Sequence, residues 1–252
     1  MTIFVVGLAV GLLSTIFGLG GGIIMVPVLT AVADLSHVEA MATSLATIVI
    51  ISLWNAWRYS QEGLVVWRVV LWVSLGSGIC AALAAQTAPL LPEKALVGFM
   101  LMVLLILAWK TFRLGSTNEK ERKTPGHQTA LGIGSLSGLV AGFTGIGGGG
   151  VTTPLMLTAG LVKNQNAAPI SNAIMISTAG AGALSYALNG VFDWPRLGLI
   201  RTDYTLLLAL GAIISSFAGI RINHLIKLKL RKTILGFILL IIALRLSFQI
   251  FT

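Results

Sequence analysis

Two runs of glycine are the residues in this sequence that could form a binding site. One runs from Gly18 to Gly22 (GLGGG) and is followed by Pro27; the other runs from Gly145 to Gly150 (GIGGGG) and is followed by Pro154. Because glycine costs about 1 kcal/mol per residue inside a helix, each run predicts a helix break. A helix that begins after such a break offers unpaired N–H groups and the positive end of its dipole, which together bind anions.

The composition places both breaks in a membrane protein. Of the 252 residues, 56% are hydrophobic and only 10% are charged, and apolar segments of about 20 residues recur along the chain. Backbone released from helical pairing cannot face lipid, so the breaks must be buried by protein or line a wet cavity. The net charge of +9 falls mostly in short loops, where it indicates membrane orientation and not nucleic-acid binding. We therefore expect an all-α polytopic membrane protein whose partner is the lipid bilayer.

An internal repeat relates the two glycine runs. A shift of 127 positions aligns the first half with the second from Gly7 to Trp67 without a gap. Identical pairs include Gly20 and Gly147, Ser44 and Ser171, and Tyr59 and Tyr186. The chain is therefore predicted to hold two repeats, 1–113 and 129–252, joined by a polar linker at 114–128.

Each repeat is predicted to contain one broken segment and three ordinary helices. In the first repeat these are the broken segment 3–33 and the helices 39–57, 69–89 and 94–112; in the second, the broken segment 130–161 and the helices 166–188, 204–222 and 231–251. Each arm of a broken segment is shorter than the roughly 20 residues that cross a bilayer. An arm is therefore not expected to cross alone.

The distribution of Lys and Arg favours re-entrant broken segments. If all eight segments cross, the basic residues divide almost evenly between the two sides. If the broken segments return to the side they entered, one side keeps only Lys94, Arg196, Arg201 and Arg245. All the other basic residues then lie on the opposite side, and such an excess of Lys and Arg is typical of cytoplasmic loops. Three crossings per repeat then make the repeats inverted, with the linker 114–128 in the cytoplasm and both termini outside. Eight full crossings with parallel repeats remain the alternative.

These motifs resemble the TauE/SafE family of sulfite and organosulfonate exporters. The resemblance rests on the paired glycine elements, each followed by proline, and on the small-polar segment Ala42-Thr43-Ser44, and it covers nearly the whole chain. It implies export of small sulfur-containing anions such as sulfite or sulfoacetate. We expect a permease of the inner membrane of a prokaryote that works by alternating access, with the substrate bound at the midplane between the two breaks. The second copy has Ile170 where the first has Thr43, so a strictly symmetric site is not expected.

Polar side chains near the breaks complete the candidate site. Thr43 and Thr47 share a helix face, and Asn172 is informative because an amide in an apolar segment needs a partner; helix–helix hydrogen bonding is the alternative role. Arg58 could attract anions at the cytoplasmic mouth or simply anchor the topology. The expected substrate-binding residues are Gly20, Gly21, Gly22, Thr43, Ser44, Thr47, Gly147, Gly148, Gly149, Gly150, Ser171 and Asn172.

Other functions lack a supporting pattern. Every Asp and Glu falls at a segment end or in a loop, the single cysteine is Cys80, and neither metal-ligand spacing nor a nucleophile–base pair is evident. We therefore expect no enzyme, no cofactor and no metal. An anion channel with the breaks as its filter, or an uptake permease for another small anion such as thiosulfate, are the alternatives. The sequence leaves the oligomeric state open.

Overall fold

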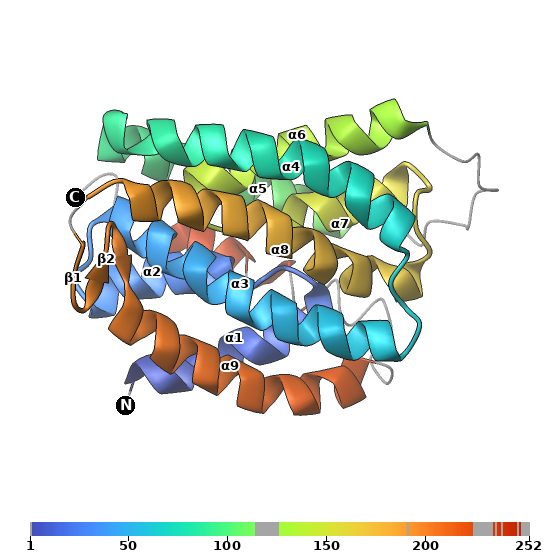
Figure 1. The fold of residues 1–252 in the computed structure, drawn as a ribbon, viewed down its shortest axis with the longest axis horizontal. Helices are drawn as coiled ribbons and strands as arrows, with labels where there is room; N and C mark the ends of the chain where they lie inside the picture. The colour runs from blue at the N-terminus through green and yellow to red at the C-terminus, as the bar shows by residue number, and fades with distance from the viewer. Residues whose placement is uncertain are drawn as a thin grey trace.

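The computed structural model describes residues 2–113, 126–190, 192–223, 234, 236–237, 239–245 and 247. The elements in chain order are α1 (Thr2–Phe17), α2 (Gly22–Val32), α3 (His37–Gln61), α4 (Trp67–Thr87), a 3₁₀ turn η1 (Ala88–Leu90), α5 (Glu93–Arg113), α6 (His127–Thr144), α7 (Gly149–Thr158), α8 (Asn164–Leu188), β1 (Phe192–Asp193), β2 (Arg196–Leu197), β3 (Ile200–Arg201) and α9 (Thr202–Asn223) (Figure 1). Most of the predicted linker and part of the predicted helix 231–251 lie outside the described residues.

Four of the described helical stretches are long and apolar enough to cross a membrane. They are His37–Gln61, Trp67–Leu90, Gln165–Leu188 and Thr202–Gly219. Leucine, valine and isoleucine side chains remain exposed along several helices, as expected where lipid is the solvent. The prediction of an all-α polytopic membrane protein is confirmed.

Each glycine run separates two antiparallel helices. The first hairpin is α1–α2, and the second is α6–α7, whose returning arms have 11 and 10 residues. At 1.5 Å per residue, neither arm spans the roughly 30 Å of a bilayer core. Both hairpins therefore turn back inside the protein.

The two hairpins enter from opposite ends of the molecule. Helix α1 runs parallel to α9, because Gly7 lies against Leu208 and Gly219 against Thr15. The start of α9 lies beside the start of α3. The end of α2 lies at the same end of the molecule (Figure 1). The second hairpin begins and ends at the other end of α3. There the Asn166 side chain of α8 donates to the carbonyl of Leu64, between α3 and α4.

Equivalent contacts occur within each half of the molecule. The Tyr59 hydroxyl donates to the carbonyl of Thr15 at 3.0 Å, and the Tyr186 hydroxyl donates to the carbonyl of Gly142 at 2.7 Å. Both partners of the second bond follow those of the first by the same 127 positions. Equivalent packing within two halves whose hairpins point in opposite directions fits an approximate two-fold rotation between them, with its axis across the helices.

Close helix packing explains several glycines outside the runs. A Cβ on Gly11 of α1 would overlap the carbonyl oxygen of Ala212 in α9, and a Cβ on Gly138 of α6 would overlap that of Ser77 in α4. Small residues allow such approach between membrane helices. These glycines hold the first arm of each hairpin against a spanning helix of the other half.

A small antiparallel meander, β1–β2–β3, joins α8 to α9 and was not predicted. It flanks Trp194, beyond which the repeat register slips. The backbone amide of Arg201 donates to the Thr43 hydroxyl at 3.1 Å, which ties the meander to α3. A side-chain hydrogen bond with Asp203, at 2.8 Å, raises the pKa of the Arg201 guanidinium and keeps it charged.

Substituting the packed glycines should separate the hairpins from their spanning partners. We expect Gly11→Leu and Gly138→Leu each to destabilise the protein by about 3 kcal/mol, because the new side chain has only a rigid backbone to displace. Thermal unfolding of the purified protein in detergent measures the loss. Gly132→Leu on the exposed face of α6, with open space around it, is the matched control; equal melting temperatures for Gly138→Leu and the control would refute the packing role.

Candidate anion-binding site

Two glycine tips meet in the interior of the protein. We define the first tip as Gly18–Gly22 and the second as Gly145–Gly149; all of their residues are buried. Left-handed backbone occurs at three glycines of each tip, with φ between 66° and 83°. Residues with a Cβ rarely adopt this conformation. The glycines are therefore needed to turn each hairpin as well as to leave its backbone bare.

Each repeat holds the tip of the other. The Ser44 hydroxyl of α3 donates to the carbonyl of Gly145 at 2.8 Å, and the Ser171 hydroxyl of α8 donates to the carbonyl of Gly18 at 2.9 Å. A Cβ on Gly22 would lie 2.5 Å from the Gly145 carbonyl oxygen, so the tips are in direct contact. The two predicted serines thus bind tip carbonyls, and they fix the tips relative to each other.

Backbone amides in both tips lack protein acceptors. Within the described part of the chain, the amides of Gly20 to Gly22 and of Gly147 to Gly150 form no hydrogen bond. The N-cap residues of α2 and α7, Gly21 and Gly148, carry no side-chain cap. A buried polar group without a partner costs about 1–3 kcal/mol. Two buried helix N-termini with bare amides are therefore suited to a small anion.

Two apolar side chains, which the sequence analysis did not single out, stand between the tips. Ile48 of α3 and Met175 of α8 both lie against Gly20 and Gly147. They occupy equivalent positions in the two repeats, and the 127-residue register was the signal that could have found them. Their bulk closes the space between the tips, so any anion held there needs these side chains to move.

The remaining predicted side chains have protein partners. The Thr47 hydroxyl donates to the carbonyl of Thr43 at 2.8 Å, and the Thr43 hydroxyl accepts from Arg201 as described above. Asn172 joins Ser14 and Asn55 in a hydrogen-bonded cluster. These contacts agree with the structural alternative that the sequence left open for the amide.

Arg58 lies away from the tips. It is half-buried near the end of α3, and its guanidinium carbon is 5.7 Å from the centre of the Phe217 ring. Fourteen residues of helix separate it from Ser44, which is about 21 Å at 1.5 Å per residue. The cation–π contact fixes Arg58 at one end of the molecule, where it could act only at a mouth.

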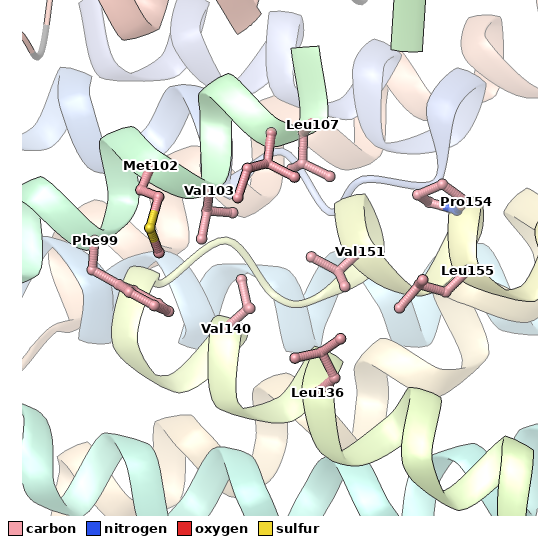
Figure 2. A pocket seen from close by; sticks show the side chains of 10 residues that line it. Phe99, Met102, Val103, Leu107, Leu136, Val140, Val151, Pro154 and Leu155 are labelled. Atoms are coloured by element: carbon pink, nitrogen blue, oxygen red, sulfur yellow. The ribbon is translucent and has the colours of Figure 1, made fainter. Parts of the chain in front are cut away.

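An apolar cavity of about 220 Å³ lies between α5, α6 and α7. Figure 2 shows side chains such as Phe99, Val140 and Pro154 pointing into it from the three helices. None of the predicted site residues lines it. Since such a lining offers no hydrogen-bond donor to replace water, the cavity is unsuited to an anion.

Nearly the whole chain matches one known family. Residues 3–246 match the family described as "Sulfite exporter TauE/SafE". The chain belongs to the TauE/SafE family. It is 27% identical to a probable membrane transporter protein of Methanocaldococcus jannaschii, with 94% of this chain and 91% of that protein covered. A probable membrane transporter protein of Haemophilus influenzae is 29% identical, with 96% and 94% covered, and the probable membrane transporter protein YunE of Bacillus subtilis is 26% identical, with 97% and 96% covered.

No solved structure gives a significant match to the chain. Membership of this family establishes a multi-pass membrane transporter and not an enzyme, as the sequence predicted. Among the described residues, no group of three or more His, Cys, Asp or Glu side chains could hold a metal ion.

Removing either of the two hydroxyls that hold the tips should lower the free energy of unfolding by a similar amount. We expect Ser44→Ala and Ser171→Ala each to cost about 1–3 kcal/mol, because each leaves a buried tip carbonyl without its donor. Thermal unfolding in detergent measures both. Thr158→Ala, whose exposed hydroxyl bonds only to the Leu155 carbonyl of its own helix, is the control. A cost in one serine variant but not the other would contradict the reciprocal arrangement.

Proposed function

We propose that this TauE/SafE protein exports a small sulfur-containing oxyanion, such as sulfite or a short organosulfonate, across the cytoplasmic membrane. The observation that carries the proposal is the pair of buried helix N-termini with unpaired amides, at Gly20–Gly22 and Gly147–Gly150. The description of the family as a sulfite exporter supports the substrate class.

The donor set suits an anion with several oxygens. Amides of both tips can donate from opposite sides, and each helix adds about half a positive charge at its N-terminus. No Lys or Arg lies in either tip, so recognition depends on the direction and spacing of backbone N–H groups. Sulfite and sulfonate groups each present three acceptor oxygens, which can satisfy more of these donors than a single halide ion.

Alternating access would use the two-fold relation between the halves. In the structure, Ile48 and Met175 and the contact between the tips close the centre. Because the repeats 1–113 and 129–252 make equivalent contacts, a rearrangement that opens one side has a counterpart that opens the other. An inside-negative potential would favour outward movement of an anion by about 2.3 kcal/mol per charge per 100 mV.

The direct packing of the tips favours a carrier over the channel alternative. A channel filter must leave a continuous path, whereas here a Cβ on Gly22 would already meet the opposite tip. An uptake permease for an anion such as thiosulfate would use the same amides, so the direction of transport needs its own measurement. Efflux of radiolabelled sulfite from proteoliposomes supplies it; efflux equal to that of protein-free liposomes would refute sulfite export.

A substitution in a glycine tip should weaken the binding of the anion. We expect sulfite to raise the melting temperature of the protein, and Gly147→Ala to weaken sulfite binding at least about tenfold, because the methyl group enters the space between the tips and the left-handed backbone is strained. A thermal-shift screen with sulfite, sulfoacetate, thiosulfate, sulfate and chloride identifies the ligand.

Gly160→Ala is the matched control for that screen. Gly160 has a similar φ of 69° but open space around it, so this variant carries the backbone strain without filling the site. If Gly147→Ala binds the ligand as tightly as the Gly160→Ala variant, the tips are not the anion site.

The proposed topology predicts which cysteines a membrane-impermeant reagent reaches. In a Cys80→Ser background, we expect Asp193→Cys in the exposed meander to react from outside intact cells. Ser116→Cys, in the linker proposed to be cytoplasmic, should react only after the membrane is opened. Labelling of both from outside would exclude inverted repeats with external termini.

A further inference from the structure

A buried polar cluster lies beside the first tip. It consists of Ser14 from α1, Asn55 from α3 and Asn172 from α8, all with no solvent exposure. The Asn55 side-chain nitrogen donates to Asn172 Oδ1 at 3.1 Å, and the Ser14 hydroxyl lies 3.5 Å from the same oxygen. The Ser14 carbonyl also accepts the amide of Gly18, which places the cluster directly at the end of α1.

The hydrogen bonds leave one carbonyl oxygen without a donor. Asn172 Nδ2 donates to the carbonyl of Ala168 at 2.9 Å, which fixes the orientation of that amide and turns its Oδ1 toward Asn55. The nitrogen of Asn55 must then face Asn172, so Asn55 Oδ1 points elsewhere and has no partner. Ser52, three residues earlier on the same face of α3, also has a buried hydroxyl without a partner.

The fold itself does not require this cluster. The cluster draws residues from both repeats. At the positions equivalent to Ser14, Asn55 and Asn172 stand Ala141, Gly182 and Leu45, and Ala179 stands in place of Ser52. The Leu45 side chain packs directly against Gly182 there. Since apolar residues complete the equivalent packing, the unpaired oxygens of Asn55 and Ser52 are best explained by a ligand.

The chemistry of the cluster suits a cation. Helix α1 ends here, and the carbonyls of its last residues, Ile16 and Phe17, accept no hydrogen bond from the described chain; a helix C-terminus carries about half a negative charge. Ends of broken helices coordinate Na⁺ in transporters. The cluster has neutral oxygens and no carboxylate, which suits a monovalent ion better than Ca²⁺ or Mg²⁺.

We propose that Asn55 Oδ1 and the Ser52 hydroxyl, the two unpaired oxygens beside the C-terminal end of α1, form a binding site for one Na⁺ ion. The counterpart in the other half lacks these oxygens, so the stoichiometry is one ion per chain. If the proposed function holds, the anion at the N-terminus of α2 lies on the far side of the same tip, and the two ions attract each other. Each then raises the affinity for the other by the same factor.

Binding of Na⁺ alone tests the site without any assumption about the anion. We expect equilibrium binding of radiolabelled Na⁺ to the purified protein to saturate at one ion per chain, and Asn55→Ala to weaken it at least about tenfold. Thr178→Val is the control, because Thr178 lies in a separate buried cluster in which it bonds to Ser77. Absence of saturable Na⁺ binding by the wild-type protein, or unchanged binding by Asn55→Ala, would overturn the proposal.

A second variant keeps the test decisive if Asn55→Ala fails to fold. Asn55→Asp retains the oxygens but loses the N–H donor, so two oxygens would face each other without a proton between them. We expect its melting temperature to rise with NaCl and not with choline chloride at equal ionic strength. The same response to both salts would show that water, and not Na⁺, satisfies the oxygens, and would contradict the site.

The coupling between the ions is measured by the affinity for sulfite. We expect the Kd for sulfite to be about tenfold lower in NaCl than in choline chloride, and this difference to disappear in Asn55→Ala. Equal sulfite affinities in the two salts would refute the coupling. If Na⁺ binds at Asn55 while sulfite binds in neither salt, the proposed substrate is wrong and the cation site stands.

Discussion

The structure depends on the need to satisfy backbone groups inside a membrane. Two hairpin tips interrupt helices in the protein interior, where no bulk water is available for the freed N–H and C=O groups. The carbonyls of Gly18 and Gly145 are satisfied across the molecule by Ser171 and Ser44. The amides on the other side of each tip are left without protein acceptors. This division, with carbonyls paired by protein and amides left bare, is the basis of the anion site that we propose at the centre.

The equivalence of the two halves determines the backbone arrangement, and departures from it supply differences in chemistry. The backbone contacts of the tips, the tyrosine hydroxyl bonds and the close glycine packing all recur in both halves. Other buried polar side chains do not. The cluster at Asn55 has no polar counterpart at the equivalent positions, whereas Ser137 pairs with Thr152 and Thr178 with Ser77 elsewhere in the interior. If the protein is a carrier as we propose, these departures would give its two conformations unequal free energies, and the proposed ion would favour one of them.

The candidate site shows how the same residue types serve structure and binding. Serine and threonine were expected to line a path for the anion because they lie one turn apart near a break. In the structure, Ser44 and Ser171 hold the tips, and Thr43 holds the meander. Ile48 and Met175, which a search for polar residues passes over, are the side chains that close the centre. Burial in lipid makes every hydroxyl seek a partner, so its presence near a site does not assign its role.

The sequence by itself determined that the chain is a helical membrane transporter with helix breaks in two matching positions. Hydropathy, glycine runs and a constant repeat register are local or periodic properties of the sequence, so they can be recognised before the fold is known. Only the tertiary structure decided that the hairpins enter from opposite ends, that Ser44 and Ser171 cross to the other repeat, and that Asn55 retains an unpaired oxygen. Those features depend on contacts between residues more than one hundred positions apart, whose pairing is set by packing and by the competition among buried polar groups.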